Sequence, residues 1–373
     1  MLQQTPIPFL DLRRLHEGLK EQLLDDIAEL IDSGAFINGP QVREFESAFA
    51  TWAGSEHCVG VASGLDALRL ALLAAGIEEG DEVIVPAMTF VATLEAVSQS
   101  GGRPVVVDVG ELDYNLDPAA VAAAVTPRTR FLLPVHLYGQ LADMRALIAI
   151  AKRHDAAIVE DACQAHGAER DGLRAGSASI AGAFSFYPGK NLGAIGDAGA
   201  LVTDDGDLAG RVRALREHGQ SVKYEHAVAG YTARLDTIQA IALSHKLPLL
   251  DGWNEERTDA ARRYGELLDG VGDLTLPRSA PGSDPVWHLY VVRTTDPAAL
   301  GEFLTERGIH TGRHYPQAVH LSQAYASLGH RAGAFPVAEA IGAEALSLPL
   351  FPGITEAQQE AVARTVACYF DRG

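Results

Sequence analysis

Short apolar runs alternate with amphipathic stretches from residue 57 to about residue 205. The apolar runs are typical of buried strands and lie near 57–62, 82–87, 103–109, 129–136, 156–161, 182–187 and 199–203. Stretches with helical periodicity separate them near 64–75, 90–100, 117–125 and 143–154. This alternation predicts an α/β fold with a parallel-dominated, seven-stranded open sheet and helices on both faces.

Further elements flank this region on both sides. Amphipathic helices are expected before it at 16–33 and 40–52, and after it come a helix at 206–217, a polar loop at 218–233 and a helical stretch from 234 to 268 interrupted at Pro248. The remainder predicts strands near 274–277, 286–294 and 309–314 and helices near 296–308, 335–345 and 355–370. We therefore expect a large domain at 1–247 and a smaller α+β domain at 248–373.

Composition narrows the possible partners of the chain. Of its 373 residues 30 are basic and 49 acidic, and the net charge of −19 argues against a nucleic-acid or membrane surface. The three scattered cysteines, Cys58, Cys163 and Cys368, are too few for a disulfide framework or a zinc site. The N-terminus carries no basic segment followed by a long apolar stretch, and no run of 18 apolar residues occurs. We expect a cytoplasmic protein without a metal.

Polar residues follow the predicted strands at the edge where open α/β sheets bind ligands. The segment VASGLDALRLALLAAG (61–76) predicts a strand, a turn at Ser63–Gly64 and a helix whose first N–H groups favour a phosphate. It contains neither GxxxxGK nor GxGxxG, so it does not specify a phosphate site by itself. Ser185 could add a hydroxyl to such a site, and the aromatic face of Phe90 could stack on a flat ligand.

Lys190 is the residue that most strongly suggests a chemistry. It lies in FSFYPGKNLGAIGDAGA (184–200), after an alternating apolar strand and inside a glycine-rich turn. In AAIVEDACQAHGA (156–168) an apolar run delivers Asp161 to a strand end, and Gln164 follows three residues later. A lysine can form a Schiff base with pyridoxal phosphate (PLP), and a carboxylate can keep its pyridine nitrogen protonated. Asp161 as a cap and Gln164 as a partner of backbone groups remain the alternatives.

Over nearly its full length the chain resembles the DegT-type sugar aminotransferases. These are PLP enzymes of the aspartate-aminotransferase fold, also called fold type I, and they act on keto sugars attached to nucleotides. The matching blocks are IPFLDL (7–12), FINGPQVREFE (36–46), SGLDALRLAL (63–72), EDACQAHGA (160–168), FSFYPGKNLGAIGDAGA (184–200), RLDTIQA (234–240) and HYP (314–316).

The resemblance implies a role for each cofactor residue. Lys190 would be the Schiff-base lysine, Asp161 the partner of the pyridinium nitrogen and Gln164 a contact to the ring oxygen. The phosphate and the ring face would be held by Gly64, Leu65, Ser185 and Phe90. A homodimer is also implied, in which the loop before RLDTIQA completes the partner's site. The family often has asparagine two residues before the arginine of that block, whereas this chain has Thr232, whose hydroxyl is shorter than an amide.

The string Gly-Leu-Asp at 64–66 further resembles members that aminate carbon 3 of thymidine-diphosphate (dTDP)-linked 3-keto-6-deoxy sugars. The expected reaction takes the amino group of an amino acid, L-glutamate, and gives a 3-amino sugar. Contacts to the sugar diphosphate are expected from Lys223, His226, Arg234, Arg313, His314 and Tyr315. For Lys223 and His226 a solvated surface charge is the alternative.

Three other functions are compatible with parts of this pattern. Amination at carbon 4 of a nucleotide sugar, or of a cyclitol ketone, would keep every cofactor residue. Relatives that dehydrate sugars have histidine in place of the Schiff-base lysine, and Lys190 argues against that reaction. A non-catalytic regulator of the same fold would not need the intact set Lys190, Asp161, Gln164 and Ser185.

Overall fold

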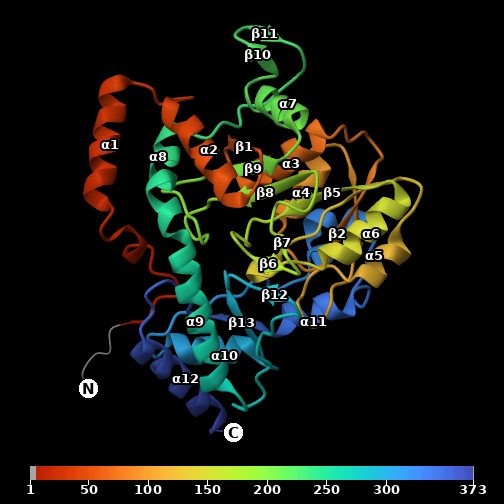
Figure 1. The fold of residues 1–373 in the computed structure, drawn as a ribbon. Coiled ribbons are helices and arrows are strands. Elements are labelled where there is room, and N and C mark those ends of the chain that lie inside the picture. Colours follow the sequence, from red (N-terminus) through yellow and green to blue (C-terminus); the bar gives the residue numbers. More distant parts are fainter. Residues whose placement is uncertain (1–5, 373) are drawn as a thin grey trace.

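A seven-stranded sheet forms the centre of the molecule (Figure 1). The computed structural model describes residues 6–372; residues 1–5, which begin the N-terminal segment discussed above, and residue 373 lie outside the described residues. In sheet order the strands are β1 (His57–Val61), β9 (Gly199–Thr203), β8 (Ala181–Ser185), β5 (Ala157–Asp161), β4 (Thr129–Leu132), β2 (Glu82–Pro86) and β3 (Arg103–Val107). Only β9 runs antiparallel to its neighbours, so the predicted parallel-dominated sheet is confirmed.

Helices cover both faces of this sheet, as predicted. They are α2 (Pro40–Ala53), α3 (Gly64–Ala74), α4 (Ala92–Gln99), α5 (Pro118–Ala124), α6 (Met144–His154), α7 (Gly206–Arg216) and α8 (Thr237–Lys246), while α1 (Lys20–Ser33) packs against α8. One apolar cluster joins α3, α4 and α7 to the sheet, and a second joins α2, α5, α6 and α8. Alternate residues of β2 separate accordingly, since Val83 and Val85 belong to the first cluster and Ile84 to the second.

Polar caps fix where several of these helices begin. The Ser63 side chain accepts a hydrogen bond from the backbone N–H of Asp66 at the start of α3, and Asp143 accepts one from the N–H of Ala146 at the start of α6. Such caps satisfy N–H groups that have no partner within the helix. Residue Ser63 thereby defines the turn that the sequence predicts at the sheet edge.

The later part of the chain forms its own apolar cluster beside the sheet region (Figure 1). Its elements are α9 (Leu250–Leu268), β13 (Tyr290–Arg293), α10 (Pro297–Thr305), β14 (Ala345–Leu348) and α12 (Glu356–Phe370), whereas the buried residues of α11 (Pro336–Glu344) join the first cluster of the sheet. The predicted strands near 274–277 and 309–314 are wrong, because those segments make only isolated bridges. Strand β14 was not predicted, and it pairs antiparallel with β13. The division at 247/248 stays a prediction, and Ile7 from the N-terminal region also joins this cluster.

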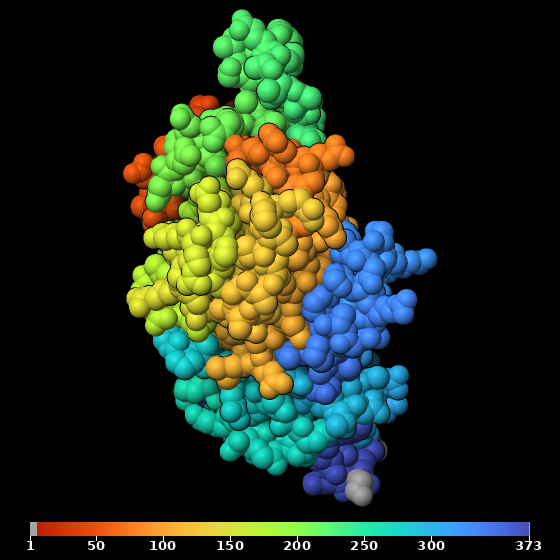
Figure 2. All heavy atoms as spheres, turned by 90° about the vertical axis from the view of Figure 1, so that its right-hand side faces the viewer, coloured from red at the N-terminus to blue at the C-terminus, as the bar shows by residue number. Residues whose placement is uncertain are grey.

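Small elements connect these layers. The loop predicted at 218–233 contains a hairpin of β10 (Gln220–Val222) and β11 (Glu225–His226), which projects from the top of the molecule (Figures 1 and 2). A three-stranded sheet combines β6 (Glu169–Arg170), β7 (Leu173–Arg174) and β12 (Ser283–Asp284). Short 3-10 helices are η1 (Arg14–His16), η2 (Leu137–Gly139), η3 (Leu247–Leu249), η4 (Val319–Leu321) and η5 (Gln323–Leu328). Among residues 6–372, no helix combines the length and apolar character needed to cross a membrane.

Phe49 joins α2 to the strand that leads to the Lys190 turn. Its ring is fully buried, 5.1 Å from the rings of both Phe184 and Phe186. Because a large buried cavity would remain, we expect Phe49→Ala to lower the free energy of unfolding by about 3–5 kcal/mol in urea titrations followed by circular dichroism. The control Leu24→Ala, at a side chain 54% exposed, should change it by less than about 0.5 kcal/mol. A loss below about 1 kcal/mol for Phe49→Ala would contradict this packing role.

Candidate active site

A cavity of about 660 Å³ opens beyond the carboxyl ends of β5 and β8. These strands pair in parallel, so Asp161 at the end of β5 and Ser185 at the end of β8 reach the same edge of the sheet. Seven of the predicted cofactor residues line this one cavity: Gly64, Leu65, Phe90, Asp161, Gln164, Ser185 and Lys190. The fold therefore brings together residues that are up to 126 positions apart, from Gly64 to Lys190.

Asp161 is a buried carboxylate with donors on both oxygens. The Thr93 hydroxyl donates to its Oδ2 at 2.9 Å, and the backbone N–H of Cys163 donates to its Oδ1 at 3.2 Å. Thr93 in turn lies 2.8 Å from the Thr89 hydroxyl. Each carboxylate oxygen has two lone pairs, so both oxygens can still accept a further hydrogen bond. The Asp161 carboxylate is thus held in one orientation and can still accept further hydrogen bonds.

Lys190 is presented by a tight turn after β8. Its backbone N–H donates to Tyr187 O at 2.8 Å. Close packing follows at Gly193, where an added Cβ would lie 2.3 Å from Pro188 O, so only glycine fits there. Burial lowers the pKa of the Lys190 amine, while Cys163 and Asp161 act in the opposite direction. A lysine with a lowered pKa is more readily available as the neutral, nucleophilic amine.

Gln164 connects the sheet edge to the later part of the chain. Its Oε1 accepts from the backbone N–H of Tyr138 at 2.8 Å, which fixes the orientation of the amide. Its Nε2 donates to the Tyr315 hydroxyl at 3.1 Å. The Tyr315 ring lies 5.5 Å from the ring of Phe90, which is 51% exposed. Gln164, Tyr315 and Phe90 therefore form one continuous wall of the cavity.

The turn before α3 packs against this edge without space for side chains. A Cβ added to Gly64 would lie 2.6 Å from Cys163 Sγ and 2.7 Å from Ser185 Cβ. One added to Gly199 would lie 2.3 Å from the carbonyl carbon of Ser63. Backbone can therefore approach closely here, and the first-turn N–H groups of α3 have no partner within the helix. Such a turn suits an anionic group such as a phosphate.

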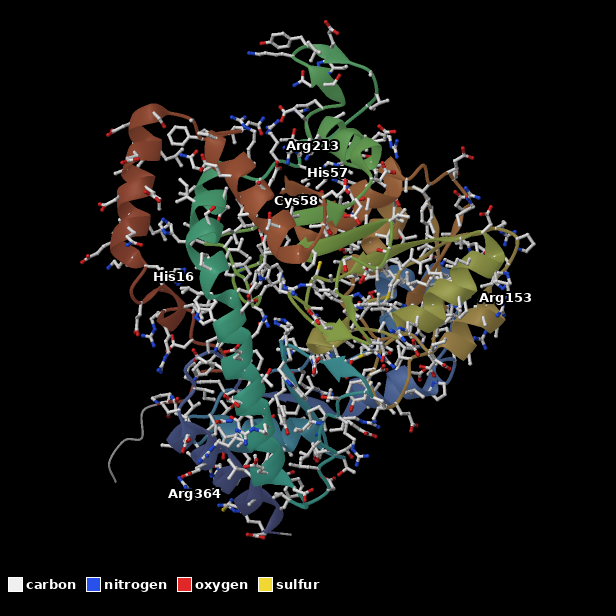
Figure 3. The ribbon with its side chains drawn as sticks, viewed as in Figure 1. His16, His57, Cys58, Arg153, Arg213 and Arg364 are labelled. Carbon is white, nitrogen blue, oxygen red and sulfur yellow. The ribbon has the colours of Figure 1, made fainter. Side chains whose placement is uncertain are left out.

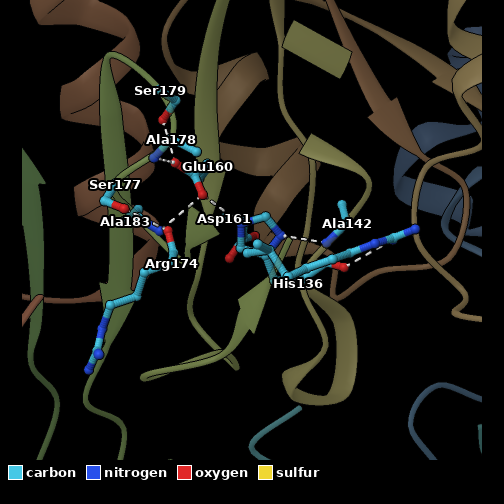
Figure 4. A network of polar contacts seen from close by, with 12 residues as sticks. His136, Ala142, Glu160, Asp161, Arg174, Ser177, Ala178, Ser179 and Ala183 are labelled. Carbon is cyan, nitrogen blue, oxygen red and sulfur yellow. Dashed lines mark hydrogen bonds and ion pairs between the residues drawn. The ribbon is translucent and has the colours of Figure 1, made fainter. Parts of the chain in front are cut away.

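A buried polar network supports the strand that carries Asp161 (Figure 4). The Glu160 carboxylate is fully buried and accepts from the backbone N–H groups of Gly176 and Ala178, both at 2.9 Å. The Ser179 hydroxyl donates to it at 2.7 Å and His136 Nε2 lies 2.8 Å away. The His136 backbone N–H also donates to Asp161 O at 3.0 Å. Donors on both oxygens offset the cost of burying this carboxylate, and the network fixes the end of β5.

Three histidines lie near Lys190, and two of them were not predicted. Burial, followed by the Lys190 charge, lowers the pKa of His314 to about 4; His314 was predicted and lines the cavity. His288 also lines the cavity. His166 lies behind it between Phe184 and Phe186, at ring distances of 5.3 and 5.8 Å. Thr93 and Tyr138 were missed as well, because their partners are distant in sequence.

The residues predicted to contact the sugar diphosphate are placed in different regions. His314 and Tyr315 line the cavity, whereas the other predicted contacts and Thr232 are not among the residues that line it within 6–372. Arg313 donates to three backbone carbonyls, those of Gly342, Ala343 and Ala345, and Arg234 pairs with Glu217 at 3.0 Å.

The hairpin and its base hold the remaining predicted residues. The Lys223 ammonium lies 5.2 Å from the centre of the Tyr224 ring, and His226 Nδ1 lies 2.8 Å from His218 O. The Thr232 hydroxyl lies 3.1 Å from His218 Nε2. A role for any of these residues in the active site stays a prediction.

A second cavity, of about 810 Å³, lies apart from Lys190, between α2, β1 and α7. His57, Cys58 and Arg213 mark its position (Figure 3). Arg213 donates to Cys58 O at 3.1 Å, and Arg216 pairs with Glu46 at 2.5 Å. Arg213 and Arg216 are thus engaged in holding β1 through the carbonyls of Cys58 and Gly60, and we take the cavity at Lys190 as the candidate active site.

Comparison with known proteins decides the family. A model of the DegT/DnrJ/EryC1/StrS aminotransferase family matches residues 17–367. The chain belongs to this family. It is 48% identical over 370 residues to the dTDP-3-amino-3,4,6-trideoxy-alpha-D-glucose transaminase of Streptomyces venezuelae, covering 99% of this chain and 98% of that protein. It is 49% identical over 360 residues to the erythromycin biosynthesis sensory transduction protein EryC1 of Saccharopolyspora erythraea, covering 96% and 98%.

A solved structure supports the same family assignment. The chain superimposes on S. venezuelae DesV in complex with a ketimine intermediate with a TM-score of 0.97 at 48% identity, covering 99% of this chain and 100% of that one. Aminotransferases of this family use PLP. The cavity fits that cofactor: it offers an amine for the aldehyde, a carboxylate for the ring nitrogen, an amide for the ring oxygen and a glycine turn at a helix N-terminus for the phosphate.

Buried His166 generates a prediction about stability and pH. Neither of its ring nitrogens makes a well-formed hydrogen bond among the residues that the structure describes, and burial, followed by the Lys190 charge, lowers the pKa of His166 to about 3 against the opposing effect of the Ser185 backbone. Its pKa in the unfolded chain is about 6.5, so below that pH the unfolded state binds a proton that the folded state does not. Stability is therefore lost as pH falls from 6.5 towards 3.

Replacing His166 by the apolar and similarly shaped phenylalanine should remove this dependence. Between pH 6.5 and pH 5, we expect the free energy of unfolding to fall by about 1.5 kcal/mol less in His166→Phe than in the original protein. Urea titrations at both pH values measure the difference, with His154→Phe at an exposed position as the control. Equal pH dependence of the two proteins would show that His166 does not remain neutral.

Proposed function

We propose that this aminotransferase transfers the amino group of L-glutamate to a nucleotide-linked 3-keto-6-deoxyhexose, a dTDP sugar, giving a 3-amino sugar. The observation that carries the proposal is the shared cavity of Lys190 and Asp161 at the ends of neighbouring parallel strands. Support for the substrate comes from the relative that is 48% identical and is named for a dTDP-3-amino-trideoxyhexose. PLP, when bound, supplies an aldehyde that exchanges amino groups and a ring that withdraws electrons from the reacting carbon.

Lys190 has two tasks in this proposal. Its amine would hold the cofactor aldehyde in the resting enzyme. Once an incoming amine had displaced it, the free lysine would take a proton from one carbon and return it to another. Both tasks need the neutral amine, and burial, which lowers the pKa of Lys190, favours that form.

The other cavity residues orient the cofactor. Asp161 pairs with the ring nitrogen through a lone pair that Thr93 and Cys163 leave free. Gln164 donates one Nε2 hydrogen to Tyr315 and has a second for the ring oxygen. The ring face stacks on Phe90, and the phosphate is held by Gly64, Leu65 and Ser185 beside the N-terminus of α3.

The sugar diphosphate requires cations that the cavity of one chain provides only in part. We infer a cytoplasmic homodimer in which the hairpin and its base, with Lys223, Thr232 and Arg234, complete the partner's site. The exposed Val222 and Tyr224 at the hairpin, 54% and 79% accessible, support an interface there. His314 and Tyr315 would contact the sugar from within the same chain, and Arg313 would support that segment through its three carbonyl partners.

A regulatory function is the second candidate, because a relative that is 49% identical is named a sensory transduction protein. The intact arrangement of Lys190, Asp161 and Gln164 favours catalysis, since ligand binding alone does not require an amine with a lowered pKa. Amination at carbon 4 of a nucleotide sugar, or of a cyclitol ketone, would use the same cofactor residues and differ only in the sugar pocket.

The first test concerns the lysine. Protein purified with PLP should be yellow, and Lys190→Ala should lose both the visible absorbance of lysine-bound cofactor and all measurable amino transfer, because within residues 6–372 no other lysine lines the cavity. Absorbance spectra and a glutamate-dependent assay measure the two effects. Lys152→Ala, at an exposed position on α6, should behave like the original protein. A colourless original protein that still binds a nucleotide sugar would favour the regulator.

The second test concerns the acceptor. The protein is given L-glutamate and a panel of nucleotide-linked 3-keto and 4-keto sugars and cyclitol ketones, and mass spectrometry detects which compound exchanges its carbonyl oxygen for an amine. We expect amination of dTDP-linked 3-keto-6-deoxy sugars. Reaction with 4-keto sugars alone would contradict the assignment to carbon 3 while leaving the aminotransferase activity established.

A further inference from the structure

His314 is held on several sides where it lines the candidate active site. Its Nδ1 lies 2.8 Å from the hydroxyl of Ser347, a fully buried residue of β14. Its ring stacks on the Phe9 ring, with 5.4 Å between the ring centres and 18° between their planes. A Cβ added to Gly312 would lie 2.6 Å from His314 Cε1 and 3.3 Å from Nδ1. This edge of the imidazole therefore occupies the space that a side chain at position 312 would need.

The remaining edge of the imidazole, which carries Nε2, is the one that meets the cavity. His314 lines the cavity, whereas Ser347 and Gly312, which contact the Nδ1 edge, are not among its lining residues within 6–372. Backbone hydrogen bonds keep this arrangement, since Gly312 N–H donates to Ser347 O at 3.1 Å and Ser347 N–H donates to Gly312 O at 2.8 Å. The Tyr138 hydroxyl also donates to His314 O. The ring is therefore held in one orientation relative to β14.

The surroundings of the Ser347 hydroxyl determine which ring nitrogen of His314 carries the proton. Among residues 6–372, His314 Nδ1 is the only hydrogen-bond partner of this hydroxyl. If Nδ1 carried the proton, it would donate to the hydroxyl oxygen, and the hydroxyl proton would be buried without an acceptor, which costs free energy. The hydroxyl therefore donates to Nδ1. The proton of the neutral imidazole is then on Nε2.

Nε2 thereby presents an uncharged N–H donor to the cavity. Burial, followed by the Lys190 charge, lowers the pKa of His314 to about 4, so the imidazole is neutral at neutral pH. A neutral donor suits an uncharged oxygen, such as a hydroxyl or carbonyl group of a sugar, whereas carboxylates and phosphates bind more strongly to cations. The chemistry of the donor therefore favours the keto sugar over the amino acid as its ligand.

We propose that Ser347 is a positioning residue for the sugar acceptor: its hydroxyl donates to His314 Nδ1 and fixes the tautomer whose Nε2–H donates to a hydroxyl or carbonyl oxygen of the nucleotide-linked sugar. The inference rests on the proposed function. Phe9 and Gly312 hold the same ring by contact with its face and its edge. The glutamate half-reaction does not need this hydrogen bond, so only the half-reaction that uses the sugar depends on it.

Two substitutions disturb the His314 ring in different ways. Ser347→Ala removes the hydroxyl and leaves both tautomers available. Gly312→Ala keeps every hydrogen-bonding group but places a methyl group where the ring lies. Gly210→Ala is the control, because a Cβ added there meets no atom within 4 Å. Single-turnover kinetics of the holoenzyme measure the half-reactions with L-glutamate and with a dTDP-linked 3-keto-6-deoxy sugar separately.

We expect Ser347→Ala and Gly312→Ala each to raise the sugar concentration needed for half-maximal rate about tenfold, because one hydrogen bond to the sugar is lost or misdirected. The glutamate half-reaction should keep both its rate and its dependence on glutamate, and Gly210→Ala should behave like the original protein. A substitution that only weakened the fold would lower the melting temperature without separating the two half-reactions. An unchanged dependence on sugar in Ser347→Ala, or an equal change in both half-reactions, would overturn the inference.

Nitrogen NMR of labelled imidazoles tests the tautomer without any assay of activity. The original protein is measured without cofactor, and His314→Gln identifies the His314 signals. Protonated Nε2 supports the inference and protonated Nδ1 refutes it, also in the case that Ser347→Ala does not fold. The proposed function fails in a different way. If the original protein aminated no keto compound, the activity and the sugar contact would be refuted together, whereas normal amination by Ser347→Ala would refute the positioning role alone.

Discussion

The site depends on one electrostatic constraint, which is that an amine and a carboxylate share a cavity where both are poorly solvated. Lys190 and Asp161 are delivered there by adjacent parallel strands, and neither closes a salt bridge that would consume the other. Removing charges from water is costly unless hydrogen bonds replace the lost solvation. Asp161 receives such bonds from Thr93 and Cys163, while Lys190 responds through its lowered pKa.

The ionisable side chains around Lys190 and Asp161 are either uncharged at neutral pH or have hydrogen-bond donors that compensate for their burial. His166 and His314 have pKa values of about 3 and 4 because of burial and the nearby lysine, so they add no positive charge at neutral pH. Behind Asp161, the buried Glu160 has donors on both oxygens. The charged groups that line the cavity are thereby Lys190 and Arg257, whose Nη1 is bound to backbone carbonyls, and the carboxylates of Asp161, Glu95 and Asp197.

The sequence predicted correctly those elements whose hydrophobic pattern matches their burial in the fold. Strands buried on both faces are continuous apolar runs, so all seven sheet strands could be located, and Lys190, Asp161 and Gln164 follow such runs directly. The segments at 274–277 and 309–314 resemble strands but make only isolated bridges, and β14 directly follows a helix without a turn. Thr93 and His288 could not be found because their partners, Asp161 and Asn191, are 68 and 97 residues away.

The hydrogen bond between Gln164 and Tyr315 has an evolutionary consequence. It joins cavity residues on the sheet, which are proposed to hold the cofactor, to cavity residues in the later part of the chain, which are proposed to contact the sugar. Because the two sets of residues come from separate elements, descendants can acquire new sugars through changes around residues 313–320 while inheriting the amino-transfer machinery intact. Position 315 is the exception, since an altered side chain there would also release the Gln164 amide, which is proposed to contact the cofactor.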